Sequence, residues 1–183
     1  MKATGIVRRI DDLGRVVIPK EIRRTMRIRE GDPLEIYTDR EGEVIFKKYS
    51  PIGELAAFAA QYAETLHKVC SLDVVICDRD AVIACAGVSK KEYLDKPLSP
   101  AMEEIIENRS LYSHREGNDT VPILADSTCF VRCAMPIICA GDIVGCVASV
   151  TDRPDEVRDR PNPEVESKLI LTAAGFLGRQ LEN

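Results

Sequence analysis

A boundary near residue 53 constrains the fold of this chain more than any other sequence feature. Ser50-Pro51 disfavours helix at the residue before the proline, and Gly53 allows the chain to begin a new element. The charge changes at the same place. Residues 1–53 hold 12 Lys and Arg against 9 Asp and Glu, a net charge of +3, whereas residues 54–183 hold 13 against 21, a net charge of −8. We expect two domains, 1–53 and 54–183, of which the first is suited to an anionic partner.

Short elements fill the first segment. The pattern predicts strands over residues 4–10 and 15–18, a turn at 11–14, a helix from Pro19, and a hairpin of residues 33–38 and 43–49. About a dozen sizeable apolar side chains in a segment this short cannot bury enough surface for a stable core. We therefore expect two chains to share one core in a dimer.

Arginines are concentrated in this segment, at Arg8, Arg9, Arg15, Arg23 and Arg24. The predicted turn brings the two strands together, and the helix follows directly, so these side chains should lie near one another. Arginine can hold a phosphate through two hydrogen bonds or bind guanine O6 and N7. The alternative is a solvated face with local ion pairs to acidic neighbours such as Asp11, Asp12 and Glu21.

The residue types found among the arginines indicate which kind of nucleic acid this segment would bind. The segment between Lys2 and Arg29 contains no aromatic residue. Base stacking on a single strand or on RNA needs aromatic side chains, so this mode is disfavoured. Duplex DNA bound through phosphate contacts and deformability fits better, with modest discrimination between sequences.

Residues 4–51, TGIVRRIDDLGRVVIPKEIRRTMRIREGDPLEIYTDREGEVIFKKYSP, closely resemble the AbrB family of bacterial transcription regulators. The resemblance implies a swapped-hairpin β-barrel in which two chains interlock and bind double-stranded DNA. By motif position, the family's DNA-contacting arginines fall on Arg8, Arg15, Arg23 and Arg24, with Lys2 and Arg9 as accessory contacts. Arg27 departs from the family pattern, which usually has glycine after the helix. A further use of this fold, as an antitoxin-like protein-binding module, is disfavoured because a second packed domain follows.

The second segment predicts an α+β domain. The pattern indicates helices over residues 54–69, 99–109 and from 162 to the end, and strands over 72–77, 81–86, 129–139 and 143–150. This order is typical of an antiparallel sheet with helices on one face. The first and last helices each carry an apolar stripe. These stripes either pack on the domain's own sheet or complete a helical bundle with a second subunit.

The stretch AMPIICAGDIVGCVASVTD resembles the final hairpin of a GAF domain. An AbrB-like segment followed by a GAF domain resembles regulators of late, forespore-type sporulation genes in endospore-forming bacteria. This resemblance implies tetramers paired through the GAF domains, no enzymatic activity, no cofactor, and a small-molecule pocket bounded by residues 90–118. The start MKATGIVRR lacks the apolar region of a signal peptide, so we expect a cytoplasmic protein with no membrane contact.

Seven cysteines in a chain without an export signal are expected to be reduced thiols. Cys129, Cys133 and Cys139 share strand parity, which predicts one buried face. The alternative to a structural role is a thiol-dependent reductase or redox sensor, which needs exposed, activated thiols. A metal site would draw on His67 with Cys70, or on His114, but the spacing of these residues does not support one, and no metal is expected.

Overall fold

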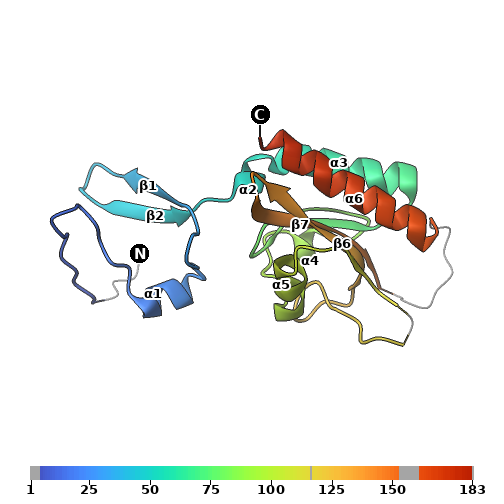
Figure 1. Ribbon diagram of the computed structural model, residues 1–183, viewed down its shortest axis with the longest axis horizontal. Helices are drawn as coiled ribbons and strands as arrows, with labels where there is room; N and C mark the ends of the chain where they lie inside the picture. The colour runs from blue at the N-terminus through green and yellow to red at the C-terminus, as the bar shows by residue number, and fades with distance from the viewer. Residues whose placement is uncertain (1–4, 116, 153–160, 183) are drawn as a thin grey trace. The chain divides into compact units, whose positions relative to one another are not determined.

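The chain folds into two compact units, Met1–Tyr49 and Ser50–Asn183 (Figure 1). The coordinates are a computed structural model that describes residues 5–115, 117–152 and 161–182. A small antiparallel hairpin with a short helix forms the first unit, and an antiparallel sheet flanked by helices forms the second. The prediction was a swapped-hairpin β-barrel followed by an α+β domain, and the structure confirms the N-terminal hairpin and the antiparallel sheet with flanking helices.

The N-terminal unit contains helix α1 (Lys20–Thr25) and the antiparallel hairpin of β1 (Leu34–Thr38) and β2 (Val44–Lys48). Residues 4–10 and 15–18 were predicted as strands, but their described part, residues 5–10 and 15–18, forms extended chain around a turn. A strand requires a ladder of backbone hydrogen bonds to a neighbour. Within the described residues, no such ladder joins these two segments, although the Asp11 N–H donates to the Arg15 carbonyl at the turn.

The C-terminal unit is built on a five-stranded antiparallel sheet in the order β4-β3-β7-β6-β5. The strands are β3 (Val74–Cys77), β4 (Val82–Ala86), β5 (Tyr112–Ser113), β6 (Phe130–Cys139) and β7 (Asp142–Thr151). The long β6–β7 hairpin is the one expected from the sequence. It places β7 in the centre, where eight consecutive residues from Val144 to Thr151 are buried.

Helices cover both faces of this sheet, which corrects the expectation of helices on one face. Helices α3 (Ala56–Cys70) and α6 (Pro163–Gln180) lie side by side on one face (Figure 1), and the short α2 (Pro51–Glu54) precedes them. Helices α4 (Lys90–Tyr93) and α5 (Pro100–Glu107) belong to a second apolar cluster on the other face. The uninterrupted apolar run of β3, with all four residues buried, is what a sheet covered on both faces requires.

The prediction that Cys129, Cys133 and Cys139 share one face is wrong, because β6 contains a bulge. The pairing register with β7 shifts between Val131 and Cys133. Cys129 and Val131 consequently belong to the cluster with α4 and α5, whereas Cys133 and Ile137 belong to the cluster with α3 and α6. One extra residue reverses which face the following side chains occupy, so strand parity does not carry across the bulge.

A buried polar network fixes α6 on the sheet. Glu166 is 2% exposed and accepts a 2.6 Å hydrogen bond from the Ser149 hydroxyl on β7. Its other oxygen lies 3.0 Å from Nη2 of Arg132 on β6, which completes a largely buried ion pair. A buried carboxylate is tolerated only when paired and hydrogen-bonded in this way. At the start of α6, the Asn162 side chain caps the helix by accepting from the Val165 N–H at 2.9 Å.

Candidate nucleic-acid interface

Arg15 is held in place by the turn that precedes it. Oδ1 of Asp11 accepts from the backbone N–H groups of Leu13 and Arg15, at 3.0 and 2.8 Å. Oδ2 of Asp11 lies 2.7 Å from Arg15 Nε. These hydrogen bonds, from the Arg15 backbone first and its side chain second, lower the pKa of Asp11 below its ordinary value. The predicted local ion pair exists at this arginine, whose side chain remains 69% exposed.

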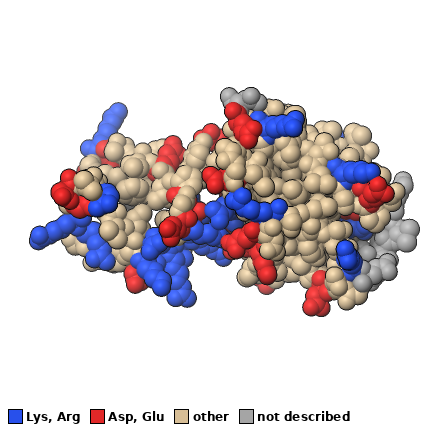
Figure 2. Space-filling model, viewed as in Figure 1, with Lys and Arg blue, Asp and Glu red and all other residues tan. Residues whose placement is uncertain are grey.

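The other predicted arginines are divided between two segments. Arg8 and Arg9 are exposed on the extended chain before the turn. Arg23 and Arg24 lie in the last turn of α1, where Arg24 is exposed and Arg23 is half-buried. Figure 2 shows basic side chains projecting from the region of this unit that contains α1. Lys2 lies outside the described residues, and the assignment of all six residues to DNA contact stays a prediction.

Arg27, which departs from the AbrB pattern, has a left-handed backbone with φ of 51°. The Arg27 N–H donates to the Arg24 carbonyl, and the Ile28 N–H donates to the Arg23 carbonyl at 2.8 Å. These two bonds make up a Schellman motif, in which the left-handed position usually belongs to glycine. The family's glycine therefore has a backbone reason that the sequence pattern alone did not reveal.

Lys48 ties the end of α1 to the hairpin, a contact that sequence reasoning missed. Its Nζ donates to the Arg27 carbonyl at 2.9 Å and lies 3.4 Å from Oδ2 of Asp32. The Asp32 side chain is 4% exposed and also accepts from the Arg29 N–H at 2.8 Å. The sequence pattern of β2 predicted that this lysine lies in a strand. Its partners are more than fifteen residues away in sequence, so no local pattern could have predicted them.

Apolar side chains in this unit face outward to an unusual degree. Among its described residues, 5–49, Pro19 is the one that is buried. Twelve large apolar residues are exposed: Ile6, Val7, Ile10, Leu13, Val16, Val17, Met26, Ile36, Tyr37, Val44, Phe46 and Tyr49. Exposed apolar surface this extensive on a small unit is typical of a surface that a further chain covers.

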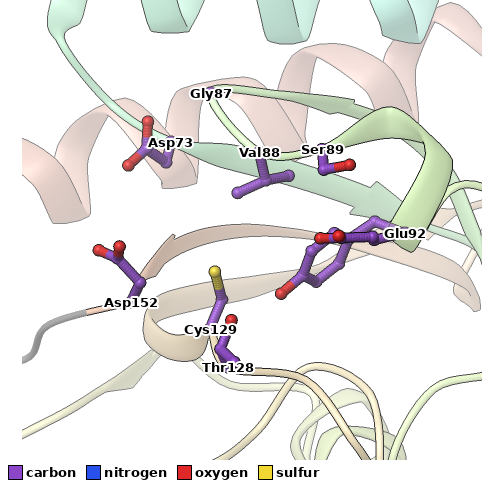
Figure 3. A pocket seen from close by; sticks show the side chains of 9 residues that line it. Asp73, Gly87, Val88, Ser89, Glu92, Thr128, Cys129 and Asp152 are labelled. Carbon is purple, nitrogen blue, oxygen red and sulfur yellow. The ribbon is translucent and has the colours of Figure 1, made fainter.

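The C-terminal unit contains a cavity of about 190 Å³ beside α4 (Figure 3). Its walls come from four parts of the chain: Asp73, residues 87–89 with 92 and 93, residues 128 and 129, and Asp152. The carboxylates of Asp73, Glu92 and Asp152 line it, together with hydroxyls and the Cys129 thiol. The predicted pocket region, residues 90–118, contributes α4, whereas no local pattern in the sequence indicated the other walls.

The thiols lie in the core. Cys77, Cys85, Cys129, Cys133 and Cys146 are buried, and Cys70 and Cys139 are half-buried. Burial raises the pKa of Cys133 to about 11 and raises the pKa of Cys85 and Cys146 as well. A raised pKa removes the thiolate that a reductase needs. Among the described residues, no group of three His, Cys, Asp or Glu side chains is arranged to hold a metal ion.

Comparisons with known proteins identify the family. A family model described as "Stage V sporulation protein T C-terminal, transcription factor" matches residues 54–182. Stage V sporulation protein T of Bacillus subtilis (strain 168) is 51% identical over 183 residues, which cover 100% of this chain and 99% of that protein. The chain belongs to the family of stage V sporulation protein T. This family comprises transcription factors of sporulation, so the chain is a regulator and not an enzyme.

Relatives of each unit are also known. Residues 7–53 match a model described as "Antidote-toxin recognition MazE, bacterial antitoxin". The solution structure of the N-terminal DNA recognition domain of Bacillus subtilis AbrB is 63% identical, covers 28% of this chain and 94% of that one, and has a TM-score of 0.25. The cofactor-binding GAF domain of CodY from Clostridium difficile is 15% identical, covers 67% and 83%, and has a TM-score of 0.48. Among the described residues, no helix is long and apolar enough to cross a membrane.

Proposed function

We propose that this member of the stage V sporulation protein T family binds duplex DNA as a dimer through its N-terminal unit. Arg8, Arg9, Arg15, Arg23 and Arg24, with Lys2, would contact the DNA. The observation that carries the proposal is the position of Arg15, which the Asp11 carboxylate holds on a turn while most of its side chain stays exposed. A pre-positioned guanidinium loses less side-chain freedom when it meets a phosphate. The 63% identity to a DNA recognition domain supports the same reading.

We infer the dimer because a single N-terminal unit has no buried apolar core of its own. A single N-terminal unit leaves twelve large apolar residues exposed and buries Pro19 alone among its described residues. A second copy, adding its extended segments 5–10 and 15–19 as strands, would pair the backbone and cover these side chains together. Interlocking of the two chains would also double the number of arginines that face one duplex.

The outer face of α3 and α6 is the proposed contact between two such dimers. Tyr62 on α3 stacks with Phe176 on α6 at 5.5 Å between ring centroids, and Phe58 on α3 lies 5.9 Å from Phe176 in a tilted arrangement. Phe176 is 40% exposed, and Leu171 on the same helix is 41% exposed. Aromatic rings that are packed together and still solvent-exposed are typical of protein interfaces. Pairing of two C-terminal units through this face would give a tetramer.

The biological setting is part of the proposal. The protein would act in the cytoplasm of the forespore on late sporulation genes, activating some and repressing others with modest sequence discrimination. A small molecule bound in the cavity of the C-terminal unit would favour one arrangement of the two DNA-binding dimers. It would thereby change the affinity for pairs of DNA sites.

Fluorescence anisotropy with a labelled duplex tests the DNA interface. If about four arginines from each of two chains neutralise phosphates, the logarithm of the binding constant should fall with the logarithm of salt concentration with a slope of about −7. Arg23→Ala and Arg24→Ala should abolish binding, whereas Arg40→Ala, in the β1–β2 turn, should change it little. A slope near −1, or equal losses in all three variants, would contradict the proposal.

A further inference from the structure

Helix α1, which carries Arg23 and Arg24, has little within itself to hold it in place. It is six residues long, all of its residues are at least partly exposed, and within the described residues no side chain caps its N-terminus. A helix this short is not stable alone in water, because too few hydrogen bonds follow the costly first turn. The position of α1 must therefore come from contacts with the rest of the N-terminal unit.

Lys48, the last residue of β2, joins the end of α1 to the hairpin. Its Nζ donates to the Arg27 carbonyl at 2.9 Å, from a position 21 residues further along the chain. The N–H of Arg27 in turn donates to the Arg24 carbonyl at the end of the helix. The ammonium group thus lies next to the C-terminus of α1, where positive charge also interacts favourably with the helix dipole.

Asp32 holds the lysine in this position. The Asp32 side chain is 4% exposed, and its Oδ2 lies 3.4 Å from Lys48 Nζ and accepts from the Arg29 N–H at 2.8 Å. The Asp32 N–H donates back to the Arg29 carbonyl at 3.3 Å, which closes the turn between α1 and β1. Removing one partner of a buried, hydrogen-bonded ion pair is strongly unfavourable. The pair is therefore a firm attachment point for the end of the helix.

The surroundings of Lys48 do not suit a direct contact to DNA. Its side chain is only 25% exposed, and the Asp32 carboxylate opposes its charge. A phosphate would have to compete with this carboxylate for the ammonium group. Arg15, by contrast, keeps most of its guanidinium in solvent and is free to meet a phosphate in two hydrogen bonds. Lys48 is thus better placed to orient α1 than to bind DNA.

We propose that Asp32 and Lys48 are positioning residues for the DNA interface. Together they set the orientation of α1 on the β1–β2 hairpin and hence the places of Arg23 and Arg24. The inference rests on the proposed function, because it takes these two arginines as DNA contacts. It adds two residues that touch no DNA and whose loss weakens binding, since displaced guanidinium groups must be ordered again when DNA binds.

Neutralising Asp32 separates positioning from charge by the sign of the effect. Asp32→Asn keeps an oxygen for the Arg29 N–H, removes the ion pair with Lys48 and makes the unit more positive. A pure charge effect would tighten DNA binding. A positioning role predicts binding about three- to tenfold weaker, measured by anisotropy of a labelled duplex with the full chain. Asp39→Asn is the matched control, since Asp39 also accepts from backbone N–H groups, and it should not weaken binding.

Double-mutant cycles measure whether Lys48 acts through α1. Arg24→Lys keeps the charge but loses the paired guanidinium hydrogen bonds, so it should weaken binding about tenfold in the wild-type chain. In Lys48→Met the same change should weaken binding less than about twofold, because Arg24 is already displaced. Arg15→Lys should weaken binding equally in both chains, since Asp11 holds Arg15. Lys48→Arg, which keeps the charge and the donors, should retain most of the wild-type affinity.

Two results would overturn the positioning role. They are an Asp32→Asn affinity equal to or higher than that of the wild-type chain, or an Arg24→Lys effect of the same size in the wild-type chain and in Lys48→Met. Thermal melts and light scattering show whether each variant keeps its fold and oligomeric state, and Asp32→Asn serves as the background for the cycle if Lys48→Met does not fold. No effect of Arg24→Lys in the wild-type chain would contradict the DNA interface itself, so the two failures can be told apart.

Discussion

Arg27 carries a conformational cost that its neighbours do not. An L-residue in the left-handed region is about 1 kcal/mol less stable than glycine at the same place. The Schellman hydrogen bonds at the end of α1 and the Lys48 contact to the Arg27 carbonyl hold the residue there. The surrounding structure therefore holds Arg27 in its strained backbone conformation, and a glycine at this position would remove the strain.

Arg27→Gly should raise the melting temperature by about 2–4 °C, the shift that corresponds to about 1 kcal/mol in a chain of this size. Differential scanning calorimetry measures it. Arg27→Ala is the matched control because it removes the guanidinium but keeps a Cβ in the left-handed region. If Arg27→Ala stabilised as much as Arg27→Gly, the effect would come from the charge and not from backbone strain.

Asp11 both builds the turn and competes for Arg15. Asp11→Asn keeps an oxygen for the Leu13 and Arg15 N–H groups but removes the negative charge from the Arg15 guanidinium. Release of the guanidinium's positive charge should outweigh the loss of its fixed position, so DNA affinity should rise about two- to fivefold, the range of an exposed ion pair. Asp39→Asn is the matched control, since Asp39 accepts from the Glu41 and Glu43 N–H groups in the same manner. Equal gains in both variants would show a general charge effect.

The pH dependence of this turn has a definite sign. The pKa of Asp11 is lowered in the folded chain, so its contribution to stability is present above the ordinary pKa of 3.8 and disappears as pH falls through the lowered value. Titration of Asp11 should therefore leave DNA affinity unchanged between pH 5 and 8. A transition in that range that disappears in Asp11→Asn, measured by anisotropy, would contradict this assignment.

At the scale of elements, α6 depends on a close approach to β6. A Cβ on Gly178 would overlap the carbonyl oxygen of Ile138, whereas a Cβ on Gly175 meets no atom within 4 Å in this unit. The two glycines lie on one helix and differ in whether they face the sheet. Gly178 allows the helix to pack closely on the sheet, whereas Gly175 has no such role and lowers helix stability.

Gly178→Ala should destabilise the protein by about 1–3 kcal/mol, because the helix must move away from the sheet. Gly175→Ala should stabilise it by about 0.5–1 kcal/mol through helix propensity. Urea denaturation followed by circular dichroism measures both. Equal and small effects would mean that α6 moves without loss, and the Glu166 network would then be its principal anchor.

Sequence reasoning succeeded where the signal was local. The Ser99-Pro100 and Asn162-Pro163 pairs predicted the starts of α5 and α6, and both polar side chains cap their helices. It failed where the outcome depended on pairing. The bulge between Val131 and Cys133 is set by the match to β7, and the second helical face is set by where the chain returns. Neither leaves a periodic trace in the sequence.

The candidate sites divide in the same way. The turn at Asp11 and its ion pair with Arg15 were predictable because the two residues are close in sequence. The cavity was not, since strand order alone brings Asp73 near Asp152: β3 pairs with β7, and these residues flank the paired ends. Residues 4–10 and 15–18 were predicted as strands because their composition suits strands, while the partner that would pair with them belongs to the proposed dimer.

At the scale of the molecule, a substitution should be able to disrupt the proposed tetramer contact without disrupting the proposed DNA-binding dimer. Phe176→Glu places a charge on the exposed aromatic cluster of α3 and α6, and a buried unpaired charge is strongly unfavourable. Size-exclusion chromatography with light scattering should show dimers in place of tetramers. Thr120→Glu adds the same charge in an exposed loop and should leave tetramers intact.

The dimers that remain should keep their affinity for one short duplex, because the N-terminal units supply both the shared core and the arginines. They should lose the gain that a tetramer has on a duplex with two spaced sites, where the second dimer binds at a high effective concentration. Anisotropy on one-site and two-site duplexes of equal length measures the difference. Loss of one-site binding in Phe176→Glu would mean that the DNA-binding dimer depends on the C-terminal units. Monomers in light scattering would mean that the N-terminal units alone cannot hold two chains together.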